Sequence, residues 1–219
     1  MVNFLTLDGK AALLAVLIGI LIVLFGGIYG PFFLAVIVLF LAFSAIVTNV
    51  GIGMKKRIKV YEAKRGWKNV VANGIIPLII VIIYWYFGSK MLDPMVLVVV
   101  YIASVAGTAA DKFASELGVL GETPISIITF KKVKKGVSGG VTAFGTVSSF
   151  VGAALIGFSG MAVGLPPVYV LIIAVSGLLG SVVDSIAGHF EENGIGNKYT
   201  SNILCAIAAA LIAYAIIAL

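Results

Sequence analysis

Long apolar runs recur along this chain and limit it to one class of fold. Each run can cross the roughly 30 Å hydrocarbon core of a membrane as a helix, whereas membrane β-strands would alternate polar and apolar residues over about 10 positions. Of the 219 residues, 61% are hydrophobic and only 11% are charged, compared with about 25% charged residues in soluble domains. The sequence therefore predicts an all-α, polytopic membrane protein with a single integral membrane domain over residues 1–219.

Short polar connections divide the apolar runs into about seven transmembrane helices. We expect them near residues 11–29, 32–50, 75–87, 94–111, 141–158, 168–188 and 201–219. Pro77 would then stand near the start of the third helix, where proline is tolerated. Every Lys and Arg except Lys90 falls on one side of this arrangement, and the positive-inside rule assigns that side to the cytoplasm. We expect a multi-pass protein of the cell membrane with a cytoplasmic N-terminus and an outer C-terminus.

The net charge of +6 does not indicate a nucleic-acid partner, because the basic residues lie in short loops where they orient helices. The densest basic run extends from Lys55 to Lys68 and fits a topology signal in contact with anionic lipid. Its last part, together with the residues up to Gly74, carries more polar side chains than such a signal needs. Cys205 has no second thiol near it in the sequence and is expected to be a packing residue.

Two aspartates near the inner ends of predicted helices mark a candidate site. Asp111 follows Gly107-Thr108 and Asp184 follows Gly180-Ser181, so one short pattern occurs twice. A charge at membrane depth costs roughly 2.5–3.5 kcal/mol on insertion scales, which makes an intramembrane carboxylate a functional candidate. Small and polar residues recur around each aspartate at spacings of three and four, so each stripe must face protein or water. Because both helices are predicted to run inward, the repeat is parallel and the aspartates reach similar depth.

Two carboxylates at close range repel and cannot both stay ionised without a cation. Oxygen ligands without His or Cys clusters favour Mg²⁺, which bridges carboxylates to substrate phosphates. We therefore predict that Asp111 and Asp184 are catalytic residues and metal ligands, with Glu116 as a base or further carboxylate. The alternative is that the aspartates only join helices through Ser and Thr hydroxyls. Three polar residues after the sixth helix are expected to be capping or solvated: His189, Glu191 and Glu192.

A lysine cluster followed by glycines gives a second candidate element. Glycines let backbone N–H groups approach an oxyanion, a helix N-terminus favours negative charge, and lysines neutralise phosphates. We expect nucleotide phosphates to bind here, at the start of the fifth helix, although lysines alone could be topology signals. No Walker motif is present. The residues of this predicted cradle are Lys131, Lys132, Gly136, Ser138, Gly139 and Gly140.

Four sequence blocks carry a family resemblance. They are Arg65-Gly66-Trp67 with Ala72-Asn73-Gly74, Ala110-Asp111-x-x-Ala114-Ser115-Glu116-Leu117-Gly118, Lys132 with Gly136-x-Ser138-Gly139-Gly140, and Gly180-Ser181-x-x-Asp184-Ser185. Over residues 50–205 the chain resembles the integral-membrane family known as domain of unknown function 92, which includes plant phytyl-phosphate kinases. More distantly, Asp111-x-x-Ala114-x-x-x-Gly118-x-x-Gly121 followed by Lys131-Lys132 is similar to the CTP-binding pattern of phytol and dolichol kinases, with Lys135 where dolichol kinases have an acidic residue.

This resemblance implies a membrane kinase that uses Mg²⁺ and transfers a phosphoryl group from a nucleotide, with CTP as co-substrate, to a prenyl monophosphate of the phytyl or geranylgeranyl type at the cytoplasmic face. The site would lie within residues 104–202 and involve Gly118 in nucleotide binding. The implied contacts to the lipid substrate are Arg65, Asn73, Ser115, Ser181 and Asn202. A cation-coupled transporter and a cytidylyltransferase acting on a lipid phosphate remain alternatives, although polar residues on one side only argue against a transporter.

Overall fold

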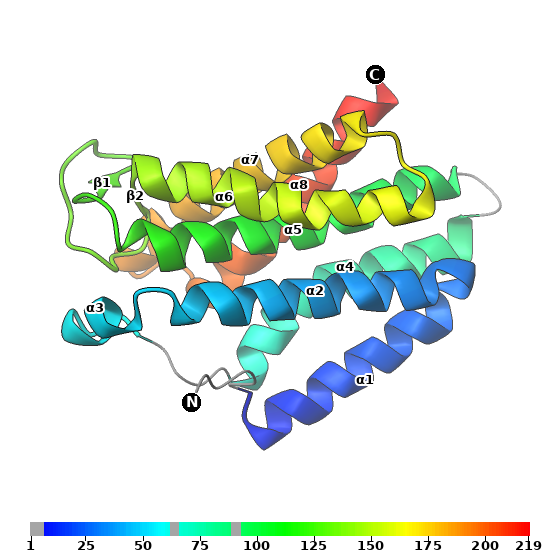
Figure 1. Ribbon diagram of the computed structural model, residues 1–219, viewed down its shortest axis with the longest axis horizontal. Coiled ribbons are helices and arrows are strands. Elements are labelled where there is room, and N and C mark those ends of the chain that lie inside the picture. Colours follow the sequence, from blue (N-terminus) through cyan, green and yellow to red (C-terminus); the bar gives the residue numbers. More distant parts are fainter. Residues whose placement is uncertain (1–6, 62–65, 89–92) are drawn as a thin grey trace.

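The computed structural model describes residues 7–61, 66–88 and 93–219, and its architecture is helical (Figure 1). The long helices are α1 (Gly9–Phe25), α2 (Gly30–Asn49), α4 (Trp67–Phe87), α5 (Pro94–Gly118), α6 (Ala143–Gly157), α7 (Val168–Glu192) and α8 (Lys198–Ala218). The shorter elements are η1 (Gly27–Tyr29), α3 (Ile52–Arg57), β1 (Ile125–Ser126), β2 (Gly140–Val141) and η2 (Phe158–Val163).

The helices confirm the predicted all-α, multi-pass membrane fold. Within the described ranges, six helical segments are long and apolar enough to cross a membrane, and α1 is apolar but shorter, with 17 residues. These seven segments correspond one to one with the predicted helices. The one basic residue that was predicted to lie on the outer side, Lys90, falls outside the described residues.

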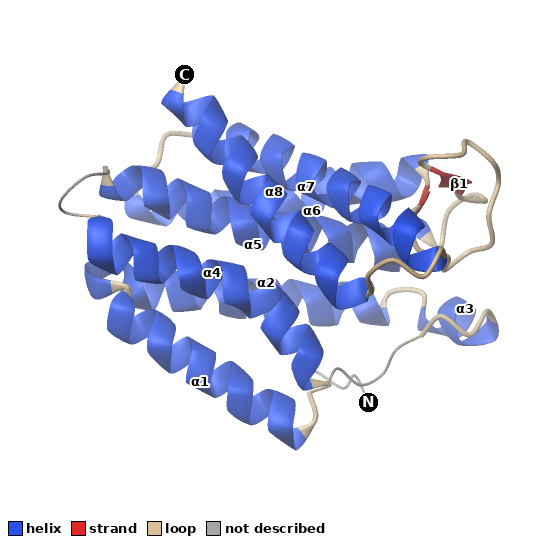
Figure 2. Cartoon of the chain, turned by 180° about the vertical axis from the view of Figure 1, so that it is seen from behind, coloured by secondary structure: helices blue, strands red, loops and turns tan. Residues whose placement is uncertain are grey.

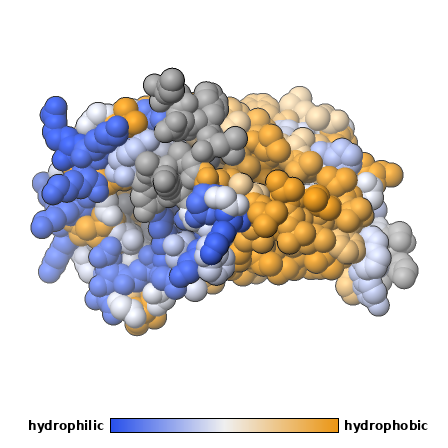
Figure 3. All heavy atoms as spheres, turned by 90° about the horizontal axis from the view of Figure 1, so that it is seen from below, coloured by the Kyte–Doolittle hydropathy of each residue, from blue (hydrophilic) through white to orange (hydrophobic). Residues whose placement is uncertain are grey.

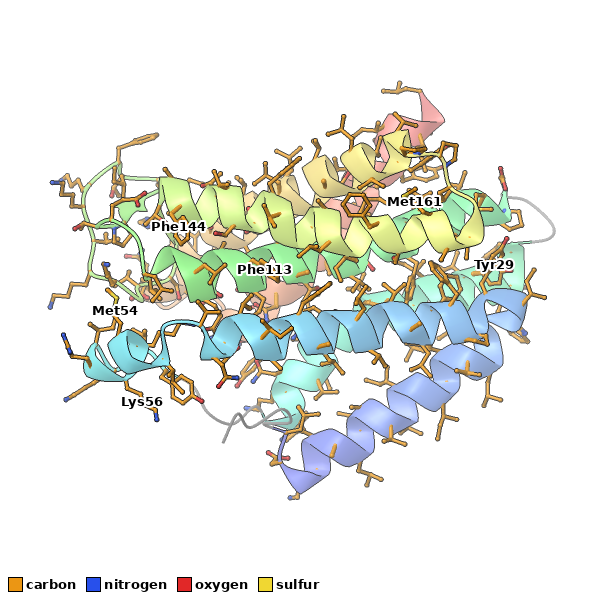
Figure 4. All side chains as sticks on the ribbon, viewed as in Figure 1. Tyr29, Met54, Lys56, Phe113, Phe144 and Met161 are labelled. Carbon is orange, nitrogen blue, oxygen red and sulfur yellow. The ribbon has the colours of Figure 1, made fainter. Side chains whose placement is uncertain are left out.

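Two groups of helices build the bundle, with α5 between them. Helices α6, α7 and α8 pack around one side of α5, while α1, α2 and α4 lie on the other (Figures 1 and 2). Helix α5 is buried continuously from Leu97 to Ala110. It is tied to α2 by the Tyr101 hydroxyl, which donates to the Phe33 carbonyl at 2.6 Å. Phe113, labelled in Figure 4, packs edge-on against Phe43 of α2.

A glycine turn joins α1 to α2 and ends α1 earlier than predicted. A Cβ atom on Gly26 would lie 2.5 Å from the Gly30 Cα, and Gly27 has a φ of 54°. Such a close return of the backbone excludes larger side chains and favours glycine at a positive φ. Pro31 then stands in the first turn of α2, where its missing N–H costs no helical bond.

Three helices extend well beyond their predicted ends, one of them α7, which continues to Glu192 and so includes His189 and Glu191. Helix α4 begins at Trp67, so Pro77 lies inside the helix rather than near its start. Helix α5 continues past Asp111 to Gly118 and includes Ser115 and Glu116. The apolar runs in the sequence indicate only the parts of the helices that face lipid. The helices themselves continue through polar residues that lie among other protein segments.

Most of the strongly hydrophilic surface visible in Figure 3 lies at one end of the molecule. In Figure 1 both α5 and α7 run towards the end that carries α3, β1 and β2. The two helices are therefore parallel, as the repeat predicted, and their aspartates lie towards the same end of the bundle.

Cysteine labelling tests which side of the membrane this polar end faces. In a Cys205→Ala background, Lys134→Cys should react with an impermeant thiol reagent from the cytoplasmic side, because lysines favour that side. Ala162→Cys in η2 should react from the opposite side, since both positions are exposed. Wild-type Cys205 is fully buried and is the unreactive control. Labelling of both positions from one face would contradict the predicted topology.

Candidate functional site

The two small-residue stripes bring α5 and α7 onto the same part of α8. A Cβ atom on Gly107 would lie 2.7 Å from the Ala209 Cβ, and one on Gly180 would lie 2.7 Å from the Cys205 carbonyl oxygen. Both stripes therefore face protein, as their spacing predicted. The absence of side chains lets the three backbones approach closely, and this packing places the aspartate of each stripe in one shared region.

Asp111 and Asp184 meet at this junction. Asp111, Asp184 and Ser201 line the same pocket, and the side chains of Asp111 and Ser201 interact with the Asp184 carboxyl group. The Oδ1 atom of Asp184 is buried and has no hydrogen-bond partner among the described residues. A buried carboxylate oxygen without a donor is costly, and two adjacent carboxylates add repulsion. The pair is thus suited to share a proton or a cation.

A pocket of about 200 Å³ surrounds the two aspartates. Its walls come from α5, the segment before α6, and helices α6, α7 and α8. The predicted residues that line it are Asp111, Ser115, Gly118, Gly136, Ser138, Gly139, Gly140, Ser181, Asp184 and Asn202. The structure therefore brings together most of the candidate site from four separate parts of the sequence.

The glycine-rich segment forms a wall of this pocket but not a helix N-terminus. Gly139 has a φ of 76°, and a Cβ atom there would lie 2.7 Å from the His189 N and the Ser185 O of α7. The Ser138 N–H donates to the Glu192 carboxylate at 2.9 Å. The predicted phosphate cradle at the start of the fifth helix is therefore wrong in its location, because these residues pack against α7 and enter β2.

The N-terminus of α6 is already capped by other groups. The Ala143 N–H donates to Glu122 Oε1 at 2.5 Å, and the Gly145 N–H donates to the Thr142 hydroxyl at 2.9 Å. Hydrogen bonds from the Glu122 N–H itself and from Ala143 and Phe144 lower the pKa of the exposed Glu122 carboxyl group. An anion would have to displace this carboxylate to bind there.

The lysines of the cluster do not enter the pocket. Lys131 and Lys132 are exposed and are absent from its lining. Lys135 donates to the Val119 and Gly121 carbonyls at 3.0 and 2.5 Å, so it stabilises the C-terminal end of α5. The lysine in the pocket wall is Lys198, the first residue of α8. Nothing in the sequence pattern distinguished Lys198 from the other basic residues.

Comparison with known proteins agrees with this architecture. The family model for integral membrane protein DUF92 matches residues 2–216. The chain belongs to this family. It is 34% identical over 208 residues to the uncharacterized membrane protein MJ0933 of Methanocaldococcus jannaschii, covering 94% of this chain and 84% of that protein. It is 32% identical over 179 residues to Protein PGR of Arabidopsis thaliana, covering 70% of this chain and 62% of that protein. No solved structure matches the chain.

In this DUF92 protein, Glu191 is a pocket residue that the sequence reasoning missed. It was expected to be solvated, but its Oε1 atom is buried and has no hydrogen-bond partner within residues 7–61, 66–88 and 93–219. Glu191 lines the same pocket as Asp184 and follows it by two helical turns on α7. That spacing was visible in the sequence and could have indicated a third acidic group on the site-facing side of the helix.

Glu116 is absent from the lining of the pocket of the DUF92 protein, and its predicted catalytic role stays a prediction. Its carboxylate pairs with Lys55 at 2.7 Å and with Lys112 one turn earlier, and it accepts a hydrogen bond from the Thr48 hydroxyl at 3.1 Å. Lys55 is fully buried and also donates to the Val47 carbonyl at 2.9 Å. Glu116 therefore joins the end of α5 to α2 and α3, which is a structural role.

The other residues that were predicted to contact the lipid substrate do not all lie at the pocket. Asn202 lines the pocket, and its side-chain Nδ2 donates to the Asn73 Oδ1 of α4 at 3.1 Å. Asn73 itself faces a second cavity on the other side of this hydrogen bond. Arg65 lies outside the described residues.

Proposed function

We propose that this DUF92 protein is a membrane kinase that transfers a phosphoryl group from a nucleoside triphosphate, with CTP as the first candidate, to a prenyl monophosphate. The observation that carries the proposal is the pair of adjacent aspartates, one with an unpartnered buried oxygen, in a pocket at the polar end of a membrane bundle. The resemblance to phytyl-phosphate kinases supplies the substrate class.

The donor set fits Mg²⁺. Asp111 and Asp184 offer two carboxylates, and since the described residues form no metal-binding group of three or more His, Cys, Asp or Glu side chains, the ion would take its other ligands from phosphates and water. Mg²⁺ is commonly held by one or two carboxylates together with substrate phosphates and waters. When bound, it would neutralise phosphate charge and hold the two phosphates together.

The other pocket residues supply positioning and charge. The bond that forms joins an oxygen of the prenyl phosphate to the terminal phosphorus of the nucleotide, and the bond that breaks releases the nucleoside diphosphate. The acceptor oxygen is already ionised, so no side chain needs to remove a proton. Lys198 and the Ser181 hydroxyl line the pocket and can contact phosphate oxygens. Such positioning and charge neutralisation account for most catalysis of phosphoryl transfer.

Product analysis tests the proposal. Purified protein with Mg²⁺, labelled CTP and a panel of prenyl monophosphates should yield prenyl diphosphate and CDP. A CDP-linked lipid with pyrophosphate would instead establish cytidylyl transfer in the same pocket. If neither product forms with any nucleotide, while the protein moves cations or prenyl phosphates across vesicle membranes, the enzyme proposal is wrong and a transporter is favoured.

A further inference from the structure

We propose that the apolar groove between α1, α2 and α4 binds the isoprenoid tail of the lipid substrate, an inference that rests on the proposed function. The groove has a volume of about 600 Å³ and is lined almost entirely by aliphatic side chains. Helix α1 splays away from α2 towards its N-terminal end (Figure 1), and apolar side chains of both helices project into the space between them (Figure 4).

Two glycines keep the groove open. A Cβ atom on Gly19 of α1 would lie 3.2 Å from the Leu34 Cδ1 of α2. A Cβ atom on Gly74 of α4 would lie 3.2 Å from the Ile18 Cδ1 of α1. Larger residues at these positions would reduce the width of the groove, so glycine preserves room for a chain between the helices.

The polar lining of the groove points to where the head group lies. The polar side chains in its wall are Asn69, Asn73 and Thr108. The two asparagines belong to the first turns of α4, and Thr108 precedes Asp111 by one turn of α5. The groove is therefore polar only towards the end where the two aspartates lie and apolar along the rest of its length.

The groove and the aspartate pocket meet at the Asn73–Asn202 hydrogen bond. Asn73 lines the groove, Asn202 lines the pocket, and their side chains are 3.1 Å apart. A phosphate entering between α4 and α8 would exchange this amide–amide hydrogen bond for bonds to its own oxygens. One ligand could then place its phosphate beside Asp111 while its tail remains in the groove.

The chemistry of the wall favours a single apolar chain over a peptide segment. A peptide would leave backbone N–H and C=O groups without partners along the aliphatic part of the groove. The outer surface of α1 is also strongly apolar, with Leu13 and Leu17 exposed and outside the groove, so this side of the protein lies in lipid. A phosphorylated isoprenoid can enter the groove directly from the membrane.

Chain-length dependence tests the groove. Gly19→Leu narrows it beyond the midpoint of α1, so phosphorylation of geranylgeranyl or phytyl phosphate should fall by about tenfold or more, with geranyl phosphate little affected. Leu17→Trp is the matched control, because Leu17 is half exposed on the same helix and does not line the groove. An equal loss with long and short chains, or the same loss in the control, would overturn the assignment.

Photo-crosslinking separates this proposal from the kinase proposal. A geranylgeranyl phosphate with a diazirine at the end of its tail, added without nucleotide, should label α1, α2 or α4 of the wild-type protein. Labelling of α6, α7 or α8, or no labelling above that of a diazirine alkane, would overturn the groove even if phosphoryl transfer is found. Labelling of the groove in a protein without transferase activity would refute the kinase and retain the lipid site.

Discussion

Asp184→Asn is expected to reduce prenyl-phosphate turnover by at least about 100-fold while the protein remains folded. The substitution removes one of the two carboxylates that would hold Mg²⁺, and the resulting loss of charge stabilisation at the transferring phosphate costs about 3–4 kcal/mol in the transition state. Asp111→Asn should behave similarly, since the two carboxyl groups line the same pocket and interact. Steady-state rates at several Mg²⁺ concentrations measure the effect.

A matched control is Asp93→Asn. Asp93 caps the N-terminus of α5 at the opposite end of the helix, where its Oδ1 accepts from the Met95 N–H at 2.9 Å. Asparagine caps helices equally well, so activity should be unchanged. Wild-type turnover in both Asp111→Asn and Asp184→Asn would refute the catalytic role of the pair.

Glu116→Leu is expected to destabilise the protein by about 3–5 kcal/mol, because it leaves the buried Lys55 ammonium without its carboxylate partner. Unfolding in mild detergent, followed by loss of helical circular dichroism, measures the change. Lys131→Leu is the control, because it removes a charge from a solvent-exposed position. Replacing both Lys55 and Glu116 by leucine should recover much of the loss, since apolar pairs often substitute for buried ion pairs.

A loss of activity without a loss of stability would instead support the catalytic role that was predicted for Glu116 from the sequence. If Glu116→Gln abolishes turnover while the unfolding midpoint stays at the wild-type value, Glu116 acts in the reaction and not in joining α5 to α2 and α3.

The membrane-spanning helices and the aspartate pair were predictable because strong physical rules apply to them. An apolar run in a membrane must form all its hydrogen bonds internally, so hydropathy alone indicates a helix. The stripes around Asp111 and Asp184 were predictable because small residues at helical spacing need protein neighbours. The structure places Gly107 and Gly180 against one segment of α8, which the sequence pattern did not specify.

Other features depended on contacts between distant segments. Its residue type and its position close to Asp111 in the sequence suggested that Glu116 is catalytic. The sequence did not reveal its ion-pair partner, Lys55, which is 61 positions away in the chain. The glycines around Gly139 suggested an anion cradle, but the sequence does not show that this backbone packs against α7. Helix ends were also missed, because polar residues such as Asn73 can lie in a helix when another helix supplies a partner.

The packing of both glycine stripes onto α8 has a consequence for biosynthesis. Chains enter the membrane from the N-terminus, so α5 is inserted while α7 and α8 are still being made. Until Cys205 and Ala209 are made, Gly107 and Gly180 lack the part of α8 against which they pack, although Gly177 of α7 can already meet Ala106 of α5. A ribosome-bound chain that ends before α8 would therefore lack the pocket wall that Lys198 and Asn202 supply, so the site is complete only after α8 has packed.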